Sequence, residues 1–210
     1  MAMSEGWNKI YNLDNSYFGE EPSDFALLCL NQMMSLGVKS VLELGAGHGR
    51  DAIFFASNDL EVEALDYSDR GIEILNKKAQ EKSCRINARP FDIKQSLPFP
   101  NASFDAVYSH MLLNMKFSKP ELRLIFSEIS RVLKPNGLNF FSVRNYRDQF
   151  YGKGIEVQEG IYDVNGFEVR FFTDNEIRSL CTEENFYTLW LKEEYEEPVT
   201  LYIVASIKMD

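Results

Sequence analysis

Short apolar runs alternate with stretches of helical periodicity along most of this chain. The apolar runs predict strands at residues 41–44, 62–65 and 104–110, with another strand closing at 90–93. A fifth strand should be entered through residues 131–138. The last two strands are predicted at 186–191 and 199–207, with the glutamate-rich residues 193–197 as a charged connection between them.

Helix-start signals fall between these predicted strands. Ser23 is a good N-cap for a helix that Gly37 would stop. The sequences at 118–121 and 173–176 have the spacing of capping boxes and begin two further helices. The apolar members of the first helix, which we expect in the core, are Phe25, Leu27, Leu28, Leu30, Met33 and Met34.

This alternation predicts an α/β fold, a doubly wound and mostly parallel sheet with helices on both faces. Only a short segment separates the last two strands, too short for a crossover helix, so the final strand should run antiparallel to its neighbours. In such a sheet ligands bind at the carboxyl ends of the strands.

Composition indicates one domain over residues 1–210. The hydrophobic content is 45%, and no linker or low-complexity tract divides the chain. We expect a cytoplasmic protein, because no apolar run has membrane-spanning length and no signal-peptide pattern is visible at the N-terminus. The isolated cysteines indicate neither a disulfide nor a metal site, and Cys29 and Cys181 fit buried helix positions.

The net charge of −10 argues against a nucleic-acid partner, since binding to phosphates depends on clustered Lys and Arg. A small-molecule partner therefore fits better.

A glycine-rich loop follows the first predicted strand. Glu43 stands in that strand, and glycines recur at 45, 47 and 49 before a helical pattern begins. Such a loop lets backbone N–H groups at a helix N-terminus approach a nucleotide-like ligand. The dinucleotide fingerprint would require glycine at position 50, where this chain has arginine. Asp66 ends the next strand, at roughly the spacing of 20 residues that suits a ribose-binding carboxylate.

The pattern E-x-G-x-G-x-G, followed by Asp66 and by the segments at 90–93, 104–110 and 131–138, resembles class I S-adenosylmethionine-dependent methyltransferases of the small-molecule type. The resemblance covers about residues 38–145. It implies a seven-stranded sheet whose last strand lies between the fifth and sixth. It also implies S-adenosylmethionine as cofactor and in-line methyl transfer to a small acceptor. We expect a monomer or homodimer that binds neither nucleic acid nor membrane.

The resemblance also implies site residues. Those expected to bind the cofactor are Glu43, Gly45, Ala46, Gly47, Asp66, Tyr67, Asp92, Ile93 and Ser109. Glu43 would favour the ammonium group, Asp66 the ribose hydroxyls, and Asp92 with Ile93 the adenine edge. His48 and Arg50 could contact the cofactor carboxylate or lie in solvent. A structural turn, a helix cap and a surface turn are the respective alternatives for Glu43, Asp66 and Asp92.

Residues on the acceptor side are less defined. His110 is a candidate general base, with a structural hydrogen-bonding role as the alternative. Tyr17, Arg144 and Tyr146 are candidates for substrate binding, the alternatives being an ordinary packed arm for Tyr17, a surface ion pair for Arg144 and a core position for Tyr146. We expect an N-terminal arm at 1–22 and a hairpin insertion near 145–172, centred on Asn165-Gly166, to act as lids.

Two other functions stay open at this stage. A noncatalytic protein could bind S-adenosylmethionine without turning it over, and a nicotinamide-dependent oxidoreductase would use a similar βαβ unit. Turnover distinguishes the first from an enzyme, and binding of NAD would support the second.

Overall fold

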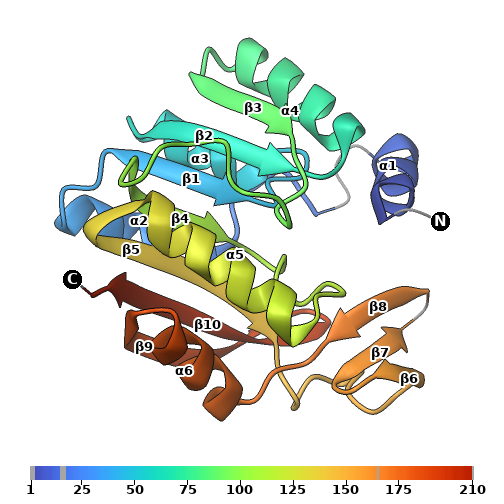
Figure 1. Ribbon diagram of the computed structural model, residues 1–210. Coiled ribbons are helices and arrows are strands. Elements are labelled where there is room, and N and C mark those ends of the chain that lie inside the picture. The colour runs from blue at the N-terminus through green and yellow to red at the C-terminus, as the bar shows by residue number, and fades with distance from the viewer. Residues whose placement is uncertain (1–2, 15–17, 165, 210) are drawn as a thin grey trace. The chain divides into compact units, whose positions relative to one another are not determined.

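The computed structural model describes residues 3–14, 18–164 and 166–209, and the side chains of residues 3–5 are not described. Within these ranges the main sheet has seven strands in the order β3-β2-β1-β4-β5-β10-β9, and a second sheet has the order β6-β7-β8 (Figure 1). The predicted seven-stranded, mostly parallel α/β sheet is confirmed. The chain divides into two compact units, residues 1–97 with 104–108 and residues 98–103 with 109–210, which are described in turn.

The helices are α1 (Met3–Leu13), α2 (Asp24–Ser35), α3 (Arg50–Ser57), α4 (Asp69–Glu81), α5 (Lys119–Val132) and α6 (Asp174–Glu183). The strands of the main sheet are β1 (Ser40–Leu44), β2 (Glu61–Asp66), β3 (Ile86–Pro90), β4 (Phe104–Ser109), β5 (Leu133–Arg144), β9 (Phe186–Glu196) and β10 (Val199–Lys208). The strands of the second sheet are β6 (Ile155–Gln158), β7 (Ile161–Val164) and β8 (Phe167–Arg170).

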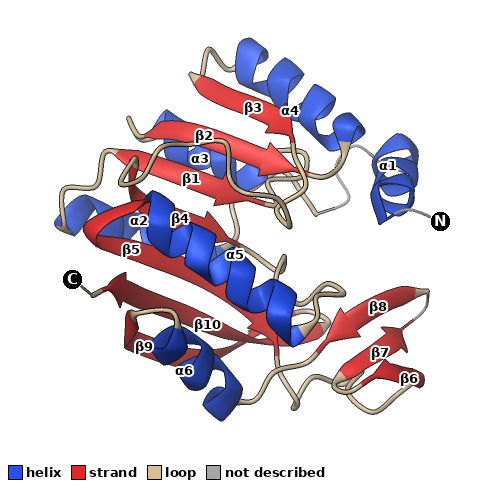
Figure 2. Ribbon diagram, in the orientation of Figure 1, coloured by secondary structure: helices blue, strands red, loops and turns tan. Residues whose placement is uncertain are grey.

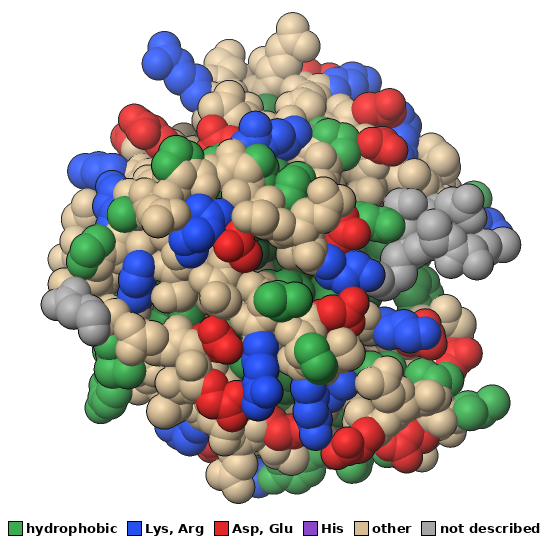
Figure 3. Space-filling model, in the orientation of Figure 1, with side chains coloured by type: hydrophobic (Ala, Val, Ile, Leu, Met, Phe, Trp, Pro, Cys, Tyr) green, Lys and Arg blue, Asp and Glu red, His purple; other side chains and the backbone are tan. Residues whose placement is uncertain are grey.

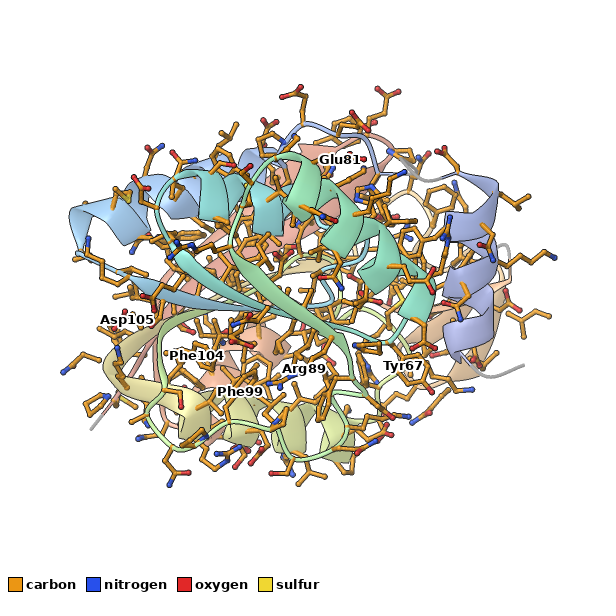
Figure 4. All side chains as sticks on the ribbon, turned by 90° about the horizontal axis from the view of Figure 1, so that it is seen from above. Tyr67, Glu81, Arg89, Phe99, Phe104 and Asp105 are labelled. Carbon is orange, nitrogen blue, oxygen red and sulfur yellow. The ribbon has the colours of Figure 1, made fainter. Side chains whose placement is uncertain are left out.

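The first unit is built on parallel strands. β2 pairs with β3 and with β1, and β1 pairs with β4, all in parallel register. Because the strands run the same way, their carboxyl ends share one edge. Tyr67, just after β2, and Asp105, near the start of β4, mark opposite ends of this sheet in Figure 4. The sequence predicted that residues 90–93 close the third strand. This was wrong for residues 91–93, because β3 ends at Pro90 and they follow it outside the strand.

Helix α2 begins as expected, because the Ser23 side chain accepts a hydrogen bond from the Ala26 N–H. Its predicted apolar face is only partly buried. Phe25 and Met33 lie in the core, whereas other members of that set are exposed, namely Leu27, Leu28 and Met34. The prediction was wrong for these three, because their positions turn away from the stripe that packs inward.

The second unit contains the antiparallel part of the sheet. β10 pairs antiparallel with β5 on one side and with β9 on the other, which confirms the predicted place of the last strand. The predicted charged connection was wrong. Residues 193–196 continue β9, and Glu196 pairs with Val199 across a turn of two residues. Helix capping boxes at Ser118 and Thr173 are both present.

The insertion after β5 is a three-stranded sheet and not a single hairpin. Figure 2 shows its short strands, which pair antiparallel in the order β6-β7-β8. β7 and β8 form the predicted hairpin, whose Asn165 lies outside the described residues. Val164, Val169 and Phe171 form a small core of their own, with Phe150 and Tyr162 packed against it.

The surface carries charges of both signs. On the face shown in Figure 3, acidic and basic side chains are interspersed. No helix in the described part of the chain is long and apolar enough to cross a bilayer.

Candidate functional site

The glycine loop joins β1 to α3 through backbone that favours glycine. Gly45, Gly47 and Gly49 have φ values of +76°, +54° and +88°, all in the left-handed region. The N–H groups of Gly45 and Ala46 donate to the carbonyl oxygen of Leu65 on β2, at 2.7 and 3.1 Å. These bonds fix the loop at the carboxyl ends of two parallel strands, which is the edge where such sheets bind ligands.

Asp66 closes β2 with its carboxylate directed back to this loop. One oxygen accepts the Gly47 N–H at 2.8 Å, and the other accepts the Ser68 N–H at 2.7 Å. Burial raises the pKa of Asp66, and the backbone donors of Ser68 and Gly47 oppose that shift. Asp66 is not the cap of α4, because the Ser68 side chain accepts the Gly71 N–H. Its carboxylate is therefore held in place while keeping capacity to accept further hydrogen bonds.

Glu43 is buried in β1 next to the loop and is 4% exposed. Its Oε2 atom has no hydrogen-bond partner among the residues that the structure describes. Burial raises its pKa well above the ordinary value, and the nearby Asp51 raises it further. A buried acceptor without a partner is costly, so this position suits a ligand that brings a cation or a hydrogen-bond donor.

Asp51, which the sequence analysis did not single out, ties the start of α3 to two other elements. Its carboxylate accepts the Ser23 N–H and the Ser23 hydroxyl, both at 2.8 Å, and the Tyr108 hydroxyl at 2.8 Å. Tyr108 stacks on Phe25, with ring centroids 5.2 Å apart. Since this network holds α2, α3 and β4 together, it fixes the base of the glycine loop. The sequence contains a single indication of this network, namely that Asp51 is an acidic residue in the first turn of a helix.

Helix α1 lies beside the amino end of α4 in Figure 1. Asn8 Oδ1 accepts the Ser68 hydroxyl at 2.6 Å and the Arg70 N–H at 3.3 Å. Tyr11 is buried, and a β-carbon built on Gly47 would come within 2.4 Å of its hydroxyl oxygen. Burial raises the pKa of Tyr11, and the neighbouring Asp66 adds to the shift. The sequence predicted an arm here but not this contact with the loop.

His48 is only 2% exposed, so the alternative of a solvated loop position was wrong. Its ring lies edge-on to Tyr11 and Phe18, with centroids 5.9 and 6.3 Å apart. Burial and the nearby cations Lys78 and Arg50 lower its pKa to about 4. The guanidinium of Arg50 donates to the carbonyl oxygen of Phe18 at 2.6 Å. The side chains of His48 and Arg50 thus both contact Phe18 and hold it near the glycine loop.

The candidates for the adenosine side follow β2 and β3. Tyr67 is 38% exposed beside Asp66. Ile93 is buried, and Asp92 lies in a turn, where its Oδ1 accepts the Lys94 N–H at 3.0 Å and its carbonyl accepts the Gln95 N–H at 2.9 Å. A structured turn with a polar tip beside a buried apolar residue is compatible with contact to a base edge.

Ser109 and His110 follow each other at the end of β4. Ser109 is fully buried, and its Oγ has no hydrogen-bond partner within the described residues. His110 Nδ1 lies 2.7 Å from Ser142 Oγ, and His110 Nε2 lies 3.0 Å from Glu196 Oε2. Glu196 was not a candidate in the sequence, because it was assigned to a charged connection.

Arg144 makes the contacts of a structural residue. It forms two hydrogen bonds to the Asp148 carboxylate, at 3.0 and 2.7 Å, and its guanidinium lies over the rings of Phe150 and Phe171. Asp148 is buried, so the pair is not a surface ion pair. Tyr146 is 39% exposed, and Tyr17 lies outside the described residues. Substrate binding by these three residues stays a prediction.

Comparison with protein families supports the interpretation of the loop. A family model for a methyltransferase domain matches residues 41–137, which begin with β1 and include the glycine loop, Asp66 and His110.

Known relatives share this part of the chain. An uncharacterized methyltransferase, YcgJ of Bacillus subtilis, is 33% identical over 106 residues, which are 50% of this chain and 40% of that protein. The sterol 24-C-methyltransferase of Pneumocystis carinii is 33% identical over 140 residues, 60% of this chain and 36% of that enzyme. The chain therefore spans less than half the length of these two relatives.

Solved structures extend the similarity to the fold of the whole chain. The 1,6-didemethyltoxoflavin-N1-methyltransferase of Burkholderia thailandensis, solved with S-adenosylhomocysteine bound, superimposes with a TM-score of 0.78 at 19% identity and covers 99% of this chain and 88% of that one. An S-adenosylmethionine-dependent methyltransferase of Clostridium acetobutylicum gives a TM-score of 0.76 at 12% identity. The match covers 98% of this chain and 100% of that one. Residues 41–137 of this chain thus match a methyltransferase domain, and the chain shares the fold of these S-adenosylmethionine-dependent methyltransferase structures.

Proposed function

We propose that this chain transfers the methyl group of S-adenosylmethionine to a small-molecule acceptor. The observation that carries the proposal is the arrangement of the donor site around the glycine loop. Asp66 is held by the N–H groups of Gly47 and Ser68. Glu43 is buried beside it, with one oxygen that has no hydrogen-bond partner in the described part of the chain.

These residues fit the cofactor by their chemistry. The carboxylate of Asp66 accepts hydrogen bonds from a ribose diol, and Glu43 receives an ammonium group that satisfies its Oε2 atom. Asp92 accepts from an exocyclic amino group, while Tyr67 and Ile93 flank the base.

When bound, S-adenosylmethionine supplies a sulfonium methyl group that is already activated for displacement. The protein then contributes alignment and exclusion of water, and alignment alone is worth roughly 7 kcal/mol or more. We assign the role of a lid that excludes water from the donor to helix α1, and the position of Tyr11 over the loop supports it. We assign the insertion at 155–170 to the acceptor side.

A small acceptor fits the charge of the molecule better than a nucleic acid does. The net charge is −10, and the basic side chains on the face in Figure 3 are interspersed with acidic ones. Charged phosphate chains would be repelled by this surface. The Burkholderia enzyme was solved with 1,6-didemethyltoxoflavin bound, and this compound is one member of the acceptor panel to test here.

Calorimetry with S-adenosylhomocysteine, followed by a radiolabelled methyl-transfer screen, tests the proposal. We expect binding of S-adenosylhomocysteine and turnover of at least one amine, phenol, thiol, oxyanion or carboxylate. Binding without turnover of any acceptor would support a noncatalytic cofactor-binding protein. Absence of binding to both S-adenosylmethionine and S-adenosylhomocysteine would overturn the assignment.

A further inference from the structure

Arg170 on β8 is a buried cation that uses little of its hydrogen-bonding capacity. The residue is 2% exposed. Within the part of the chain that the structure describes, its guanidinium makes one hydrogen bond, from Nε to the carbonyl oxygen of Phe117 at 3.0 Å. A guanidinium has five N–H donors, and buried donors are nearly always hydrogen-bonded, so Arg170 is an exception.

The other arginines of the second unit each lie beside a carboxylate. The ion pairs are Arg123–Glu183, Arg131–Glu128, Arg144–Asp148, Arg147–Glu193 and Arg178–Asp174. No ion pair of Arg170 is found among the described residues. A buried charge is costly unless it is paired, yet the most deeply buried arginine of this unit is the one that lacks a carboxylate.

Two carboxylates act on Arg170 without contacting it. Burial lowers the pKa of Arg170, and the charges of Glu176 and Glu159 oppose that shift. Glu176 accepts the N–H and the hydroxyl of Thr173, and Glu159 forms an ion pair with Lys119. Both carboxylates are therefore engaged elsewhere, and their field disfavours a second negative charge beside Arg170.

The surroundings hold the guanidinium in place and leave one side uncovered. The Arg170 N–H donates to the carbonyl oxygen of Asn114 at 2.7 Å, and β8 lies beside the amino end of α5 in Figure 2. The guanidinium carbon lies 5.9 Å from the centroid of the Phe172 ring. A β-carbon built on Gly160, in the turn between β6 and β7, would stand 3.5 Å from Nη1 of Arg170. Because Gly160 has no side chain, Nη1 lacks cover on that side.

Asn114 adds a second unsatisfied group on the segment that touches β8. It is buried, and its Oδ1 atom has no hydrogen-bond partner among the described residues. Buried polar groups are costly when left unsatisfied, and two of them on adjoining backbone indicate a polar ligand.

We propose that Arg170 is a binding site for a small organic carboxylate, formed by the second unit alone. A guanidinium fork binds a carboxylate through two parallel hydrogen bonds. The field of Glu159 and Glu176 favours a single negative charge over a phosphate dianion, and the Phe172 ring offers apolar contact to an aromatic carboxylate. The site goes beyond the proposed methyl transfer, because it does not depend on the donor loop.

Titration calorimetry of the full chain with 4-hydroxybenzoate tests the site. The neutral analogue 4-hydroxybenzamide and inorganic phosphate are the comparison ligands. We expect 4-hydroxybenzoate to bind with a Kd of about 1 mM or lower. Both comparison ligands should bind about tenfold more weakly or not at all, because the charge-assisted bidentate pair is lost.

Arg170→Gln should lower the affinity for 4-hydroxybenzoate about tenfold, to the level of the neutral analogue. Arg178→Gln is the matched control, since it removes an exposed arginine of the same unit. It should keep the affinity within about twofold of wild type, as expected for a surface ion pair.

A pair of glycine variants tests the site with Arg170 in place, whether or not Arg170→Gln folds. Gly160 and Gly152 have φ values of +73° and +68°, so substitution by Ala strains both similarly. The added carbon would meet Nη1 at Gly160, whereas nothing lies within 4 Å of it at Gly152. We expect the affinity for 4-hydroxybenzoate to fall about fivefold or more in Gly160→Ala and to change less than about twofold in Gly152→Ala.

The carboxylate could be a methyl acceptor or an effector that is not methylated, and radiolabelled S-adenosylmethionine separates the two sources. Label on 4-hydroxybenzoate identifies an acceptor, and binding without label identifies an effector; either result supports the site.

Four outcomes would each overturn the inference: no binding of 4-hydroxybenzoate, equal affinity for its neutral analogue, unchanged affinity in Arg170→Gln, or equal effects of the two glycine substitutions. Failure of the wild type to bind S-adenosylhomocysteine would instead overturn the proposed methyl transfer and leave this site standing.

Discussion

The hydroxyl oxygen of Tyr11 lies 2.4 Å from the place where a β-carbon on Gly47 would stand. Helix α1 and the glycine loop therefore meet at a point where only a residue without a side chain fits. Gly71, in the first turn of α4, lies on the other side of the same contact, since a β-carbon there would approach the Gly47 carbonyl oxygen at 3.0 Å. The donor loop, α1 and α4 are thus fitted to one another at glycine positions.

Replacing Gly47 by Ala should displace α1 and weaken cofactor binding. The new methyl group would overlap the Tyr11 hydroxyl, and the φ of +54° adds a strain of about 1–2 kcal/mol. Gly37→Ala is the matched control, because its φ is +72° and nothing lies within 4 Å of the added carbon. We expect urea unfolding to show a larger decrease in the free energy of unfolding for Gly47→Ala than for Gly37→Ala. Calorimetry should show reduced S-adenosylhomocysteine affinity for Gly47→Ala alone. Equal losses in both variants would mean that strain alone acts.

Asp66→Ala should weaken S-adenosylhomocysteine binding by roughly 1 to 3 kcal/mol, through the loss of hydrogen bonds to a charged acceptor. It also removes the acceptor of the Gly47 and Ser68 N–H groups, so the loop loses a constraint. Asp69→Ala, at an exposed position three residues later, is the control. Titration calorimetry gives the affinities, and an unchanged value for Asp66→Ala would remove this residue from the site.

Glu43 should release a proton when S-adenosylmethionine binds. Burial raises the pKa of Glu43 in the folded protein, so the folded chain binds more protons at this residue than the unfolded chain does. The free energy of unfolding should therefore fall as the pH rises above the ordinary pKa of glutamate, and Glu43→Gln should remove that slope.

An ammonium group beside Glu43 favours the ionised form and drives the proton out. Calorimetry of S-adenosylmethionine binding in buffers of different ionisation enthalpy measures the release. Wild type should show it and Glu43→Gln should not; identical buffer dependence in the two proteins would contradict the role of Glu43.

His48 should make the protein sensitive to acid. Its pKa is lowered from 6.5 to about 4 in the folded state, so the unfolded chain binds more protons between these values. The contribution of neutral His48 to the free energy of unfolding is fully present above pH 6.5. It is lost as the pH falls toward 4, by about 3 kcal/mol at most. Urea unfolding across this window should show a shallower decline for His48→Gln than for wild type. Parallel curves would show that other groups cause the acid sensitivity.

The glycine loop and the elements around it could be predicted from the sequence because their signals are local. The strand, the glycine spacing and Asp66 are features of single segments, and the capping residues Ser23, Ser118 and Thr173 are read within four positions. The antiparallel last strand followed from the length of a connection. Each of these depends on neighbours in the chain.

The features that the sequence did not predict depend mainly on contacts between segments that are distant in the chain. Asp51 binds Ser23 and Tyr108, which are 28 and 57 positions away, and no local pattern announces such a network. Glu196 was mistaken for part of a solvated run, because charge density hides the strand that continues through it. Strand β6 was missed for a similar reason, since all four of its residues are exposed.

The insertion between β5 and α6 offers a route to engineering. Its strands pack around Val164, Val169 and Phe171, so they form a module with an interior of its own. Side chains of neighbouring segments contact it: Arg144 stacks on Phe150 and Phe171, and the Arg170 side chain donates to the Phe117 carbonyl. Lys116 and Lys119 form ion pairs with Glu168 and Glu159. Chimeras that exchange this module with those of other methyltransferases, while keeping the two arginines, would recombine acceptor preferences on an unaltered donor platform.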